Sequence, residues 1–461
     1  MLTSIQIKNF KAWKDTGKVR LAPLTVIFGA NSAGKSSLGH LLLALKQTTL
    51  SSDRRRALHL GDSYSLIDLG TFKECIYKHK IEKPLSFSLT WKLPKTVTVE
   101  DPIQKKNRYR GDHLELDVTL HAGKGDQPDV TSLSYILNDG DKTSLKVSYK
   151  KDDKNKFDLT SLEYKFIRTK GRAWQLDEPE KFYRISEQSK ARFQNVEFLT
   201  DFALSAENVL DKFYYLGPLR ESPKRIYLWS GERPEYVGLK GEYSIAAILS
   251  AQEEGRLLNR GPKCRLQNFA EFIATWLKDL GIIHSFTVKP VAEGRKEYEV
   301  IVKTHQNAAE VKITDVGVGV SQVLPALVGA FYCPPGSVVW MEQPEIHLHP
   351  QVQSELADVF ISAIKSRENS HERNVQMIIE GHSEHFLNRL QRRIAEGEIT
   401  PDQVAIYFCK QSGKGAELEP LEVDLYGDIV NWPENFFGDE MAEMTARTTA
   451  AMKRKMEEQG Q

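Results

Sequence analysis

The sequence is poor in cysteine and has no excess of charge of either sign. Its four cysteines, Cys75, Cys264, Cys333 and Cys409, lie far apart and form no Cys-x-x-Cys pair. This spacing argues against a disulfide framework or a structural zinc site, and it favours a reducing compartment. The 63 basic residues nearly balance the 62 acidic ones, so any contact with nucleic acid has to come from local basic patches.

Long apolar runs, heptad series and internal repeats are also absent. No segment approaches the roughly 20 apolar residues of a membrane helix. The first residues, MLTSIQIKNF, alternate like a strand and lack the pattern of a signal peptide. We therefore expect a cytoplasmic protein without a membrane partner. A chain of 461 residues is too long for one ordinary domain.

The segment GANSAGKSS, Gly29 to Ser37, fits the phosphate-binding pattern G-x-x-x-x-G-K-[ST]. It follows the apolar run LTVIF and precedes a helical stripe formed by Leu38, Leu41, Leu42 and Leu45. In such a loop the backbone N–H groups surround phosphate oxygens, the lysine faces the β- and γ-phosphates, and the serine holds Mg²⁺. The expected nucleotide-binding residues are Gly29, Asn31, Ser32, Gly34, Lys35, Ser36 and Ser37, with Ser36 as a metal ligand.

The segment VVWMEQPE predicts an acidic residue at the end of a buried strand. Val338 to Met341 would form the strand, and Glu342 at its end would organise Mg²⁺ and a water molecule. The next residue is Gln343, at the place where a general base would be expected. Glutamine cannot accept a proton.

Two further segments carry polar residues that could meet a phosphate. DVGVGVSQVLPAL predicts a glycine-rich turn before a helix, where Ser321 and backbone N–H groups could bind an anion. IIEGHSEHF places His382 just past an apolar strand, within reach of a γ-phosphate or of an attacking water. A plain turn and a structural histidine are the alternatives. His347 and His349, in HLHP, lack a further metal ligand at a familiar spacing.

Basic residues gather in YLGPLRESPKRIY, which contains Arg220, Lys224 and Arg225 among tyrosines. This mixture suits contact with the phosphates of a nucleotide or a nucleic acid, and a surface turn is an equal alternative. The basic residues of QKKNRYR and Arg54 to Arg56 are expected in solvated loops.

The middle of the chain has a different residue pattern. From about residue 84, the segments LSFSLTW, LELDVTL, SLKVSY and LEYKF predict antiparallel strands. A more helical stretch follows to about residue 215. GEYSIAAILSAQEE and LQNFAEFIATWLKDL predict a pair of helices, and the tail from about residue 440 predicts a polar helix or disorder.

In this order the motifs resemble the ABC-type ATPase head shared by RecF, the SMC proteins and the OLD (overcoming lysogenisation defect) ATPases. The resemblance is carried by IKNFKAW, GANSAGKSS, VGVGVSQVLPAL, MEQPEIHLHP and GHSEHF. More narrowly, LHLGDSYSLIDLGTF, YLGPLRESPKRIY and WPENFF look like a bacterial group of stand-alone OLD-like ATPases that carry a C-terminal domain of unknown function.

The resemblance implies an α/β fold, an ABC-type P-loop ATPase head with an inserted antiparallel β-rich lobe and helical elements. Residues 1–83 and 206–440 would build the head, 84–205 the inserted lobe, and 441–461 a polar tail. It also implies that two heads sandwich ATP and Mg²⁺, which makes the protein a homo-oligomer.

In such a sandwich, one chain would close over the γ-phosphate bound by the other. The residues expected to do so are Gly319, Ser321 and Gln322. Glu342 would take the Walker B position, His382 the switch position, and Lys11 a basic position near the nucleotide. Candidates for the glutamine that follows the first helix in such heads are Gln47 and Asp68.

The departure from the family pattern is Gln343, where glutamate is usual. It implies slow hydrolysis or a long-lived ATP-locked state. Glu345 is close in sequence but lies beyond Pro344.

The resulting hypothesis is an ATP-binding, slowly hydrolysing switch. Dimerisation of its heads would control a separate effector, a nuclease or toxin, in bacterial defence against phages or plasmids. The alternative is a RecF-like DNA-repair clamp acting on DNA ends or gaps. An ABC transporter ATPase is disfavoured because the L-S-G-G-Q loop is missing. About seventy residues follow GHSEHFL, short for the OLD nuclease domain. There, Glu422, Asp424 and Asp428 are expected in a strand and a turn, not in a metal cluster.

Overall fold

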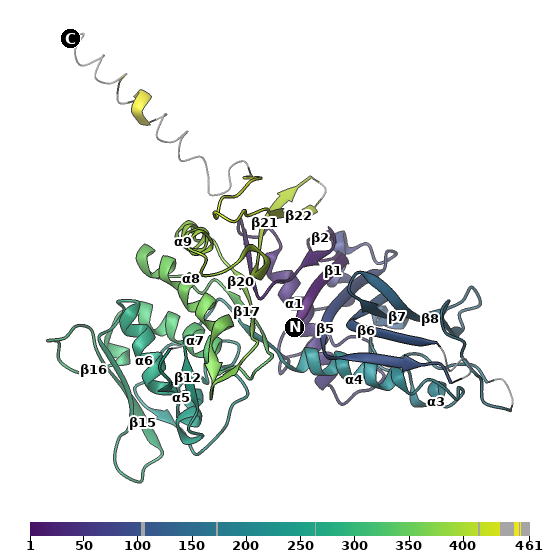
Figure 1. Cartoon of the computed structure of the whole chain (residues 1–461), viewed down its shortest axis with the longest axis horizontal. Helices are drawn as coiled ribbons and strands as arrows, with labels where there is room; N and C mark the ends of the chain where they lie inside the picture. The colour runs from purple at the N-terminus through teal and green to yellow at the C-terminus, as the bar shows by residue number, and fades with distance from the viewer. Residues whose placement is uncertain are drawn as a thin grey trace.

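The structure, a computed structural model, describes residues 1–102, 107–171, 174–262, 264–413, 415–433, 447–450 and 452. Most of the tail expected from residue 441, together with Lys105 and Lys106 of QKKNRYR, lies outside the described residues. Within them, two large sheets and one central helix organise the chain (Figure 1). No helix in the described part is long and apolar enough to cross a membrane.

The central sheet is mainly parallel. Its strands follow the order β10 (Phe213–Leu216), β17 (Val338–Glu342), β20 (Gln376–Glu380), β4 (Leu24–Gly29), β21 (Val404–Ser412) and β22 (Gly415–Leu421). All neighbours are parallel except β22, which forms a hairpin with β21. The strands β4, β17 and β20 are buried along their whole length because both faces of the sheet are covered. Their carboxyl ends therefore meet at one edge.

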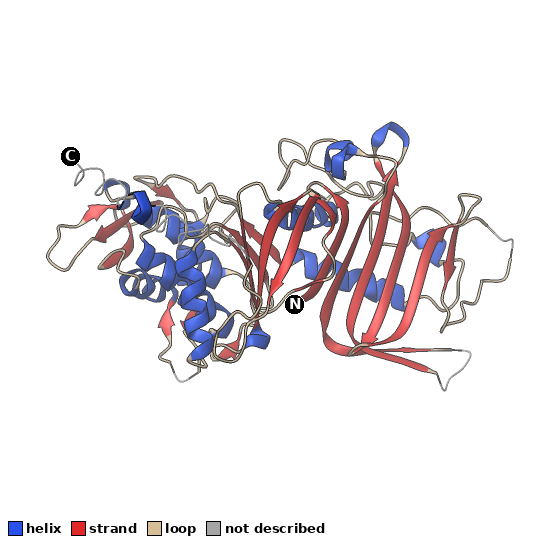
Figure 2. Ribbon diagram, turned by 90° about the horizontal axis from the view of Figure 1, so that it is seen from above, coloured by secondary structure: helices blue, strands red, loops and turns tan. Residues whose placement is uncertain are grey.

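The second sheet is antiparallel and forms the β-rich lobe. Its main path is β2 (Trp13–Asp15), β1 (Leu2–Phe10), β5 (Leu85–Glu100), β6 (Arg108–Ala122), β7 (Pro128–Asp139), β8 (Lys142–Lys151) and β9 (Phe157–Thr160), and β3 (Val19–Arg20) also pairs with β1. Figure 2 shows these long strands on one side of the molecule and the helix-rich part on the other. The mixed α/β fold with an antiparallel β-rich lobe is confirmed. The boundary expected at residues 83 and 84 falls between paired strands of one sheet, since β1 pairs with β5.

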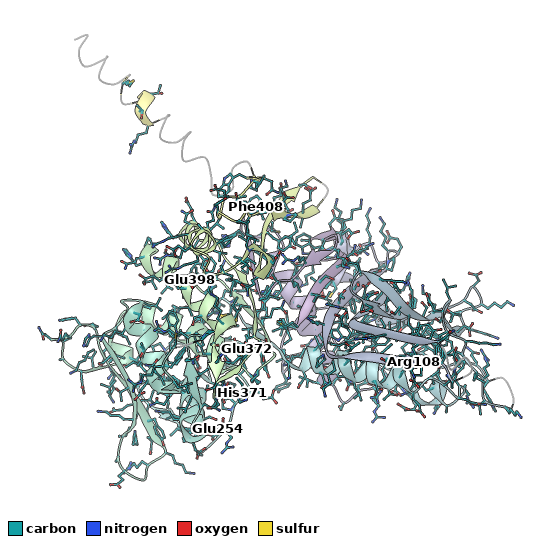
Figure 3. All side chains as sticks on the ribbon, viewed as in Figure 1. Arg108, Glu254, His371, Glu372, Glu398 and Phe408 are labelled. Carbon is teal, nitrogen blue, oxygen red and sulfur yellow. The ribbon has the colours of Figure 1, made fainter. Side chains whose placement is uncertain are left out.

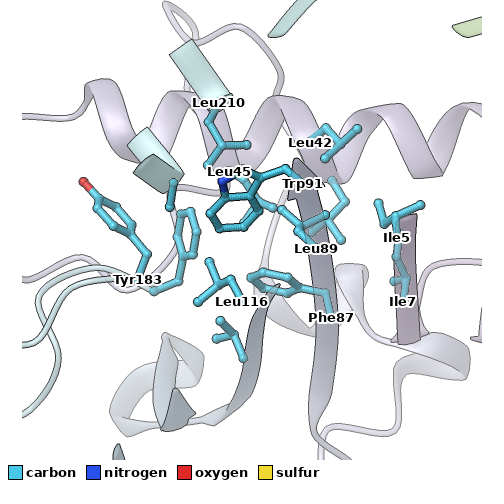
Figure 4. Close-up of a cluster of buried hydrophobic side chains, with 14 of the residues drawn as sticks. Ile5, Ile7, Leu42, Leu45, Phe87, Leu89, Trp91, Leu116, Tyr183 and Leu210 are labelled. Carbon is cyan, nitrogen blue, oxygen red and sulfur yellow. The ribbon is translucent and has the colours of Figure 1, made fainter. Parts of the chain in front are cut away.

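Helix α1 (Lys35–Leu50) lies between the two sheets. Figure 4 shows Leu42 and Leu45 of this helix packed with Leu89 and Trp91 of the β-rich lobe. Its opposite side approaches the central sheet so closely that a Cβ atom on Gly39 would lie 2.8 Å from the ring of Trp340. The helix that begins at the phosphate loop is thus fixed from both sides.

Five helices share the hydrophobic core on the other face of the central sheet. They are α5 (Ser244–Glu253), α6 (Phe269–Asp279), α7 (Val318–Tyr332), α8 (Pro350–Lys365) and α9 (Glu384–Ala395). Two small sheets accompany them, one of β11 (Tyr227–Leu228), β14 (Ser285–Pro290), β15 (Glu297–Lys303) and β16 (Val311–Lys312), the other of β12 (Leu257–Asn259), β13 (Gln267–Asn268), β18 (Arg367–Glu368) and β19 (His371–Glu372). The expected helix pair is confirmed as α5 and α6.

The strand expected at Leu162–Phe166 is wrong, because this segment runs without regular structure. Its apolar residues anchor the segment to neighbouring parts of the chain. The buried ring of Tyr164 packs edge-on against Phe198 at the start of α4 (Phe198–Asp211), and its hydroxyl donates to the carbonyl of Asn195, 2.9 Å away. The segment is therefore tied to the chain before α4 instead of extending the sheet. The helical stretch expected to residue 215 is limited to α3 (Glu187–Lys190) and α4.

Candidate nucleotide-binding site

The phosphate loop joins β4 to α1 in a conformation that requires its glycines. Gly29 has φ 143°, and a Cβ atom there would lie 2.0 Å from the carbonyl oxygen of Cys409. Gly34 has φ 103°, with Ala12 only 2.8 Å from the position of a Cβ atom. Both positions exclude any larger residue. Asn31 and Ser32 at the tip of the loop are exposed.

Neighbouring elements hold the loop in place. The indole N–H of Trp13, from β2, donates to the hydroxyl of Ser37, 2.9 Å away, and contacts the carbonyl of Gly34 at 3.1 Å. On the other side, the amide of Gln411 in β21 donates to the carbonyl of Ser32 at 3.0 Å. The loop is therefore held by hydrogen bonds from both sides.

Lys35 is buried and turned onto the loop itself. Its Nζ donates to the carbonyl oxygens of Gly29, at 2.9 Å, and Ala30, at 2.8 Å. Burial lowers the pKa of this ammonium group, while the nearby Glu380 and Glu342 oppose that shift. A bound phosphate would offer Lys35 stronger, charged acceptors than two neutral carbonyls.

Two buried carboxylates meet at the edge of the sheet beside this loop. Glu342 and Glu380 are register partners at the ends of β17 and β20. The Ser36 hydroxyl donates to Oε1 of Glu380 at 2.8 Å, and the Tyr215 hydroxyl donates to Oε1 of Glu342. Burial raises the pKa of both carboxyl groups, and the charge of Glu380 adds to the effect on Glu342. One hydroxyl and two carboxylates are the hard oxygen donors that suit Mg²⁺, so the residues fit this ion.

Glu380 was not singled out from the sequence. The signal was present, because VQMIIE is a buried strand that ends in an acidic residue, as VVWME does. What the sequence does not reveal is that β20 lies between β17 and β4. This strand order places Glu380 directly between Glu342 and the phosphate loop.

The turns that follow β17 and β20 are joined to each other. Gln343 has φ 45°, and its N–H donates to the carbonyl of Glu380 at 2.7 Å. Glu345 is buried, which raises its pKa, and its Oε1 accepts the backbone N–H of His382 at 2.6 Å. Burial, aided by the charge of Lys35, lowers the pKa of His382 to about 4, so its imidazole is neutral near pH 7.

The glycine-rich segment before α7 lies on the opposite face of the central sheet from α1. Helix α7 begins at Val318 directly after Gly317 and has no side-chain cap. Gly319 lies in its first turn next to Leu348, which would be 3.7 Å from an added Cβ atom. Ser321 is buried and Gln322 is half-buried. The structure thus places these candidates away from the helix that starts at the chain's own phosphate loop (Figure 1).

The remaining candidates around α1 have different surroundings. Lys11 lies in the turn between β1 and β2, and its charge contributes, after burial, to lowering the pKa of His40 on α1. The Gln47 side chain donates to the carbonyls of His59 and Ile67 at 2.7 and 3.1 Å and accepts the N–H of Ile67. It anchors the following loop at the far end of α1. Asp68 is exposed and accepts the N–H of Gly70.

The basic segment after β10 divides into one site residue and two surface residues. The Arg220 guanidinium is buried and donates to the backbone carbonyl of Glu342 at 3.0 Å. Its Nε and Nη1 atoms are buried without hydrogen-bond partners among the described residues, and burial lowers its pKa to about 10. Lys224 is exposed and pairs with Glu221, while Arg225 pairs with Asp315 at 2.8 Å.

Other polar candidates take structural roles. His349 caps α8 by accepting the N–H of Gln351. Asp424 accepts the N–H groups of Tyr426 and Asp428, which describes a turn. Arg108 lies on the β-rich lobe (Figure 3) and pairs with Glu100 at 3.3 Å. Across the described ranges, no group of three histidine, cysteine or acidic residues could hold a metal ion.

Comparisons with solved structures find distant likenesses to SMC heads. The SMC head bound to the C-winged helix domain of ScpA is 11% identical, with 92% of this chain and 98% of that chain covered and a TM-score of 0.42. An SMC head with an extended coiled coil, bound to the C-terminal domain of ScpA and derived from Pyrococcus furiosus, is 10% identical, with 91% and 96% covered and a TM-score of 0.39. The SMC head domain from Thermotoga maritima is 9% identical, with 92% and 99% covered and a TM-score of 0.35.

No curated protein matches the chain in sequence. Residues 399–446 match a family described only as a protein of unknown function, DUF3696. Residues 1–236 and 243–387 match the family described as the AAA ATPase domain, which covers the phosphate loop, Glu342, Glu380 and His382. The chain belongs to this family of AAA ATPase domains.

Proposed function

We propose that this protein is an ATP-binding, slowly hydrolysing switch whose head dimerisation controls a separate effector, a nuclease or toxin, in bacterial defence against phages or plasmids. The proposal is supported chiefly by the residues that meet at the carboxyl edge of the central sheet. There a preformed phosphate loop faces two buried carboxylates, while the adjacent position 343 carries glutamine.

ATP would bind with its phosphates in the loop between β4 and α1. Lys35 would leave the carbonyls of Gly29 and Ala30 and turn to the phosphates. The N-terminus of α1 adds favourable partial charge. Mg²⁺ bound together with ATP would be held by Ser36 and Glu342 and would neutralise phosphate charge.

Slow hydrolysis follows from the groups around position 343. Gln343 can orient a water molecule through its amide but cannot take its proton. Glu345, the next carboxylate along the chain, is buried and accepts the backbone N–H of His382. Since that bond ties the two turns together, Glu345 serves to hold His382 in place. ATP would persist in the closed state.

Closure of two heads would use the N-terminal end of α7. Gly317 is exposed there with no atom within 4 Å of an added Cβ, and at Gly319 an added Cβ would meet only Leu348, in ordinary contact at 3.7 Å. Free N–H groups at a helix start favour an anionic partner. Because this end lies on the opposite face of the central sheet from α1, we infer that it meets the nucleotide of a second copy.

The loop from Gly217 to Leu228 could pass the state of the nucleotide to an effector. Arg220 in this loop contacts the carbonyl of Glu342, and Arg225 pairs with Asp315 just before α7. The same loop exposes three large apolar side chains, Leu219 at 75%, Ile226 at 48% and Leu228 at 78%. This loop and the β-rich lobe together form the surface where an effector could bind. The loop could move when the two heads close, because it contacts both β17 and the segment before α7.

ATP binding should depend on Lys35. Lys35→Ala removes a charge-assisted contact worth roughly 1.5–3 kcal/mol, so we expect affinity for a fluorescent ATP analogue to fall at least about tenfold. Lys14→Ala, which removes an exposed lysine in β2, is the control and should bind like wild type. Equal affinity of all three proteins would show that the loop does not hold the phosphates.

ATP should bring two heads together through the start of α7. Ser321 is 9% exposed, so a large side chain there risks unfolding the helix, and Gly319→Arg is the cleaner variant. In sedimentation velocity with a non-hydrolysable ATP analogue, wild type should dimerise and Gly319→Arg should remain monomeric while binding the analogue. Ala292→Arg, in an exposed turn between β14 and β15, is the control. Equal dimer content in both variants would contradict the shared site.

Hydrolysis should be slow because position 343 lacks a base. Gln343→Glu places a carboxylate beside the expected water, and general-base assistance typically contributes about 10²–10⁴-fold. We expect higher steady-state phosphate release and a shorter-lived dimer, with Gln343→Ala as the control that adds no base. A wild-type rate already equal to that of Gln343→Glu would mean that another residue supplies the base.

A nuclease or toxin encoded beside this gene should co-purify with the protein expressed from its native operon. Mass spectrometry identifies the partner, and Leu228→Glu should reduce its recovery without changing ATP binding. Leu425→Glu, 75% exposed in a turn before the tail, is the control. Recovery of replication or recombination proteins instead would favour a RecF-like clamp, and full biological activity of this chain alone would contradict a separate effector.

A further inference from the structure

We propose that Glu380 is a third protein ligand of the divalent cation. Ser36, Glu342 and Glu380 would then form a site that binds Mg²⁺ or Mn²⁺ before any nucleotide arrives. The inference rests on the proposed nucleotide site and deepens it, because it concerns the same edge of the central sheet.

The serine expected to bind the cation faces Glu380. Its hydroxyl donates to Oε1 of Glu380 at 2.8 Å. Glu380 and Glu342 end neighbouring parallel strands in the same register, and such strands lie about 4.8 Å apart. A cation could replace this hydrogen bond if the Ser36 O–H turned away and offered its oxygen lone pair. The cation would then lie among oxygen atoms of all three residues.

One oxygen of Glu380 has no other role. The residue is 3% exposed, and its Oε2 atom is buried without a hydrogen-bond partner among the described residues. The indole of Trp340 lies nearby, but its N–H is also without a partner there. A buried carboxylate oxygen without a donor costs free energy. A bound cation would remove that cost.

The surrounding charges favour a divalent ion. Glu342 is contacted by the hydroxyl of Tyr215, and the imidazole of His40 lies 3.7 Å from its Oε1. Lys35 directs its ammonium group to backbone carbonyls. The two carboxylates thus end neighbouring strands without an ion pair to a lysine or arginine among the described residues. Oxygen donors alone select Mg²⁺ and Mn²⁺ over softer metals.

A different role for Glu380, as the base that takes a proton from water during hydrolysis, makes a different prediction. A base does not need to contact the cation, so its removal would lower turnover and leave metal affinity unchanged. Metal binding in the absence of nucleotide therefore separates the two roles.

The test is a titration of nucleotide-free protein with Mn²⁺, followed by electron paramagnetic resonance of the free ion. Wild type should bind one Mn²⁺ per chain. Glu380→Gln keeps the size of the side chain and an acceptor for Ser36 but removes the charge. Because loss of residues that only support metal ligands costs about 10–100-fold in affinity, loss of a direct ligand should cost at least about tenfold.

The matched control is Glu355→Gln. Glu355 lies on α8, and its Oε2 is also buried without a partner in the described part of the chain, but it faces neither a serine hydroxyl from the phosphate loop nor a second strand-end carboxylate. It should leave Mn²⁺ affinity unchanged. If Glu380→Gln fails to fold by circular dichroism, Ser36→Ala and Glu380→Asp replace it, and both should weaken binding.

Two results would overturn the inference. One is a wild-type protein that binds no Mn²⁺ without nucleotide. The other is a folded Glu380→Gln variant that binds Mn²⁺ as tightly as wild type. Either result, obtained with a protein that binds an ATP analogue in a Lys35-dependent way, leaves the proposed function intact. Loss of analogue binding in wild type would instead count against the nucleotide site itself.

Discussion

The nucleotide site depends on how closely α1 packs against the central sheet. Gly39 lets the helix approach until a Cβ atom would lie 2.8 Å from Trp340 and from Tyr215. Ser36 is one turn earlier, so this approach brings its hydroxyl to Glu380. Tyr215 contributes to both the helix packing and the carboxylate site. Its ring lies against Gly39, and its hydroxyl donates to Glu342. A larger residue at position 39 would push the helix away and separate the phosphate loop from both carboxylates.

That packing keeps two acidic residues close in a buried place. Burying Glu342 and Glu380 costs free energy, both through desolvation and through repulsion between the two charges. Single hydrogen bonds from Ser36 and Tyr215 offset only part of this cost. A pair of apolar residues at the same strand ends would stabilise the fold more. The pair is therefore better explained by a ligand that needs negative charge than by stability.

The parts of the site that follow from local sequence could be predicted, and those that follow from topology could not. The phosphate loop and Glu342 each lie next to a recognisable strand, and the glycine pattern fixes the loop. Glu380 and Arg220 become site residues only through the strand order β10, β17, β20, β4, which no local pattern reveals. The strand expected at 162–166 was wrong because alternation also arises when single side chains, such as Tyr164, anchor an irregular segment.

Helix α7 lies between the nucleotide site and the surface that we propose to meet a second head. Its C-terminal end is held by the buried guanidinium of Arg373, which donates to the carbonyls of Ala330 and Cys333. Its N-terminal end is uncapped and adjoins the pair formed by Arg225 and Asp315. Pro325 removes one backbone hydrogen bond between the two ends. If the end of β17 shifts, Arg220 and Arg225 would transmit the shift to Asp315, just before α7. The uncapped N-terminal end of α7 would therefore move before its C-terminal end.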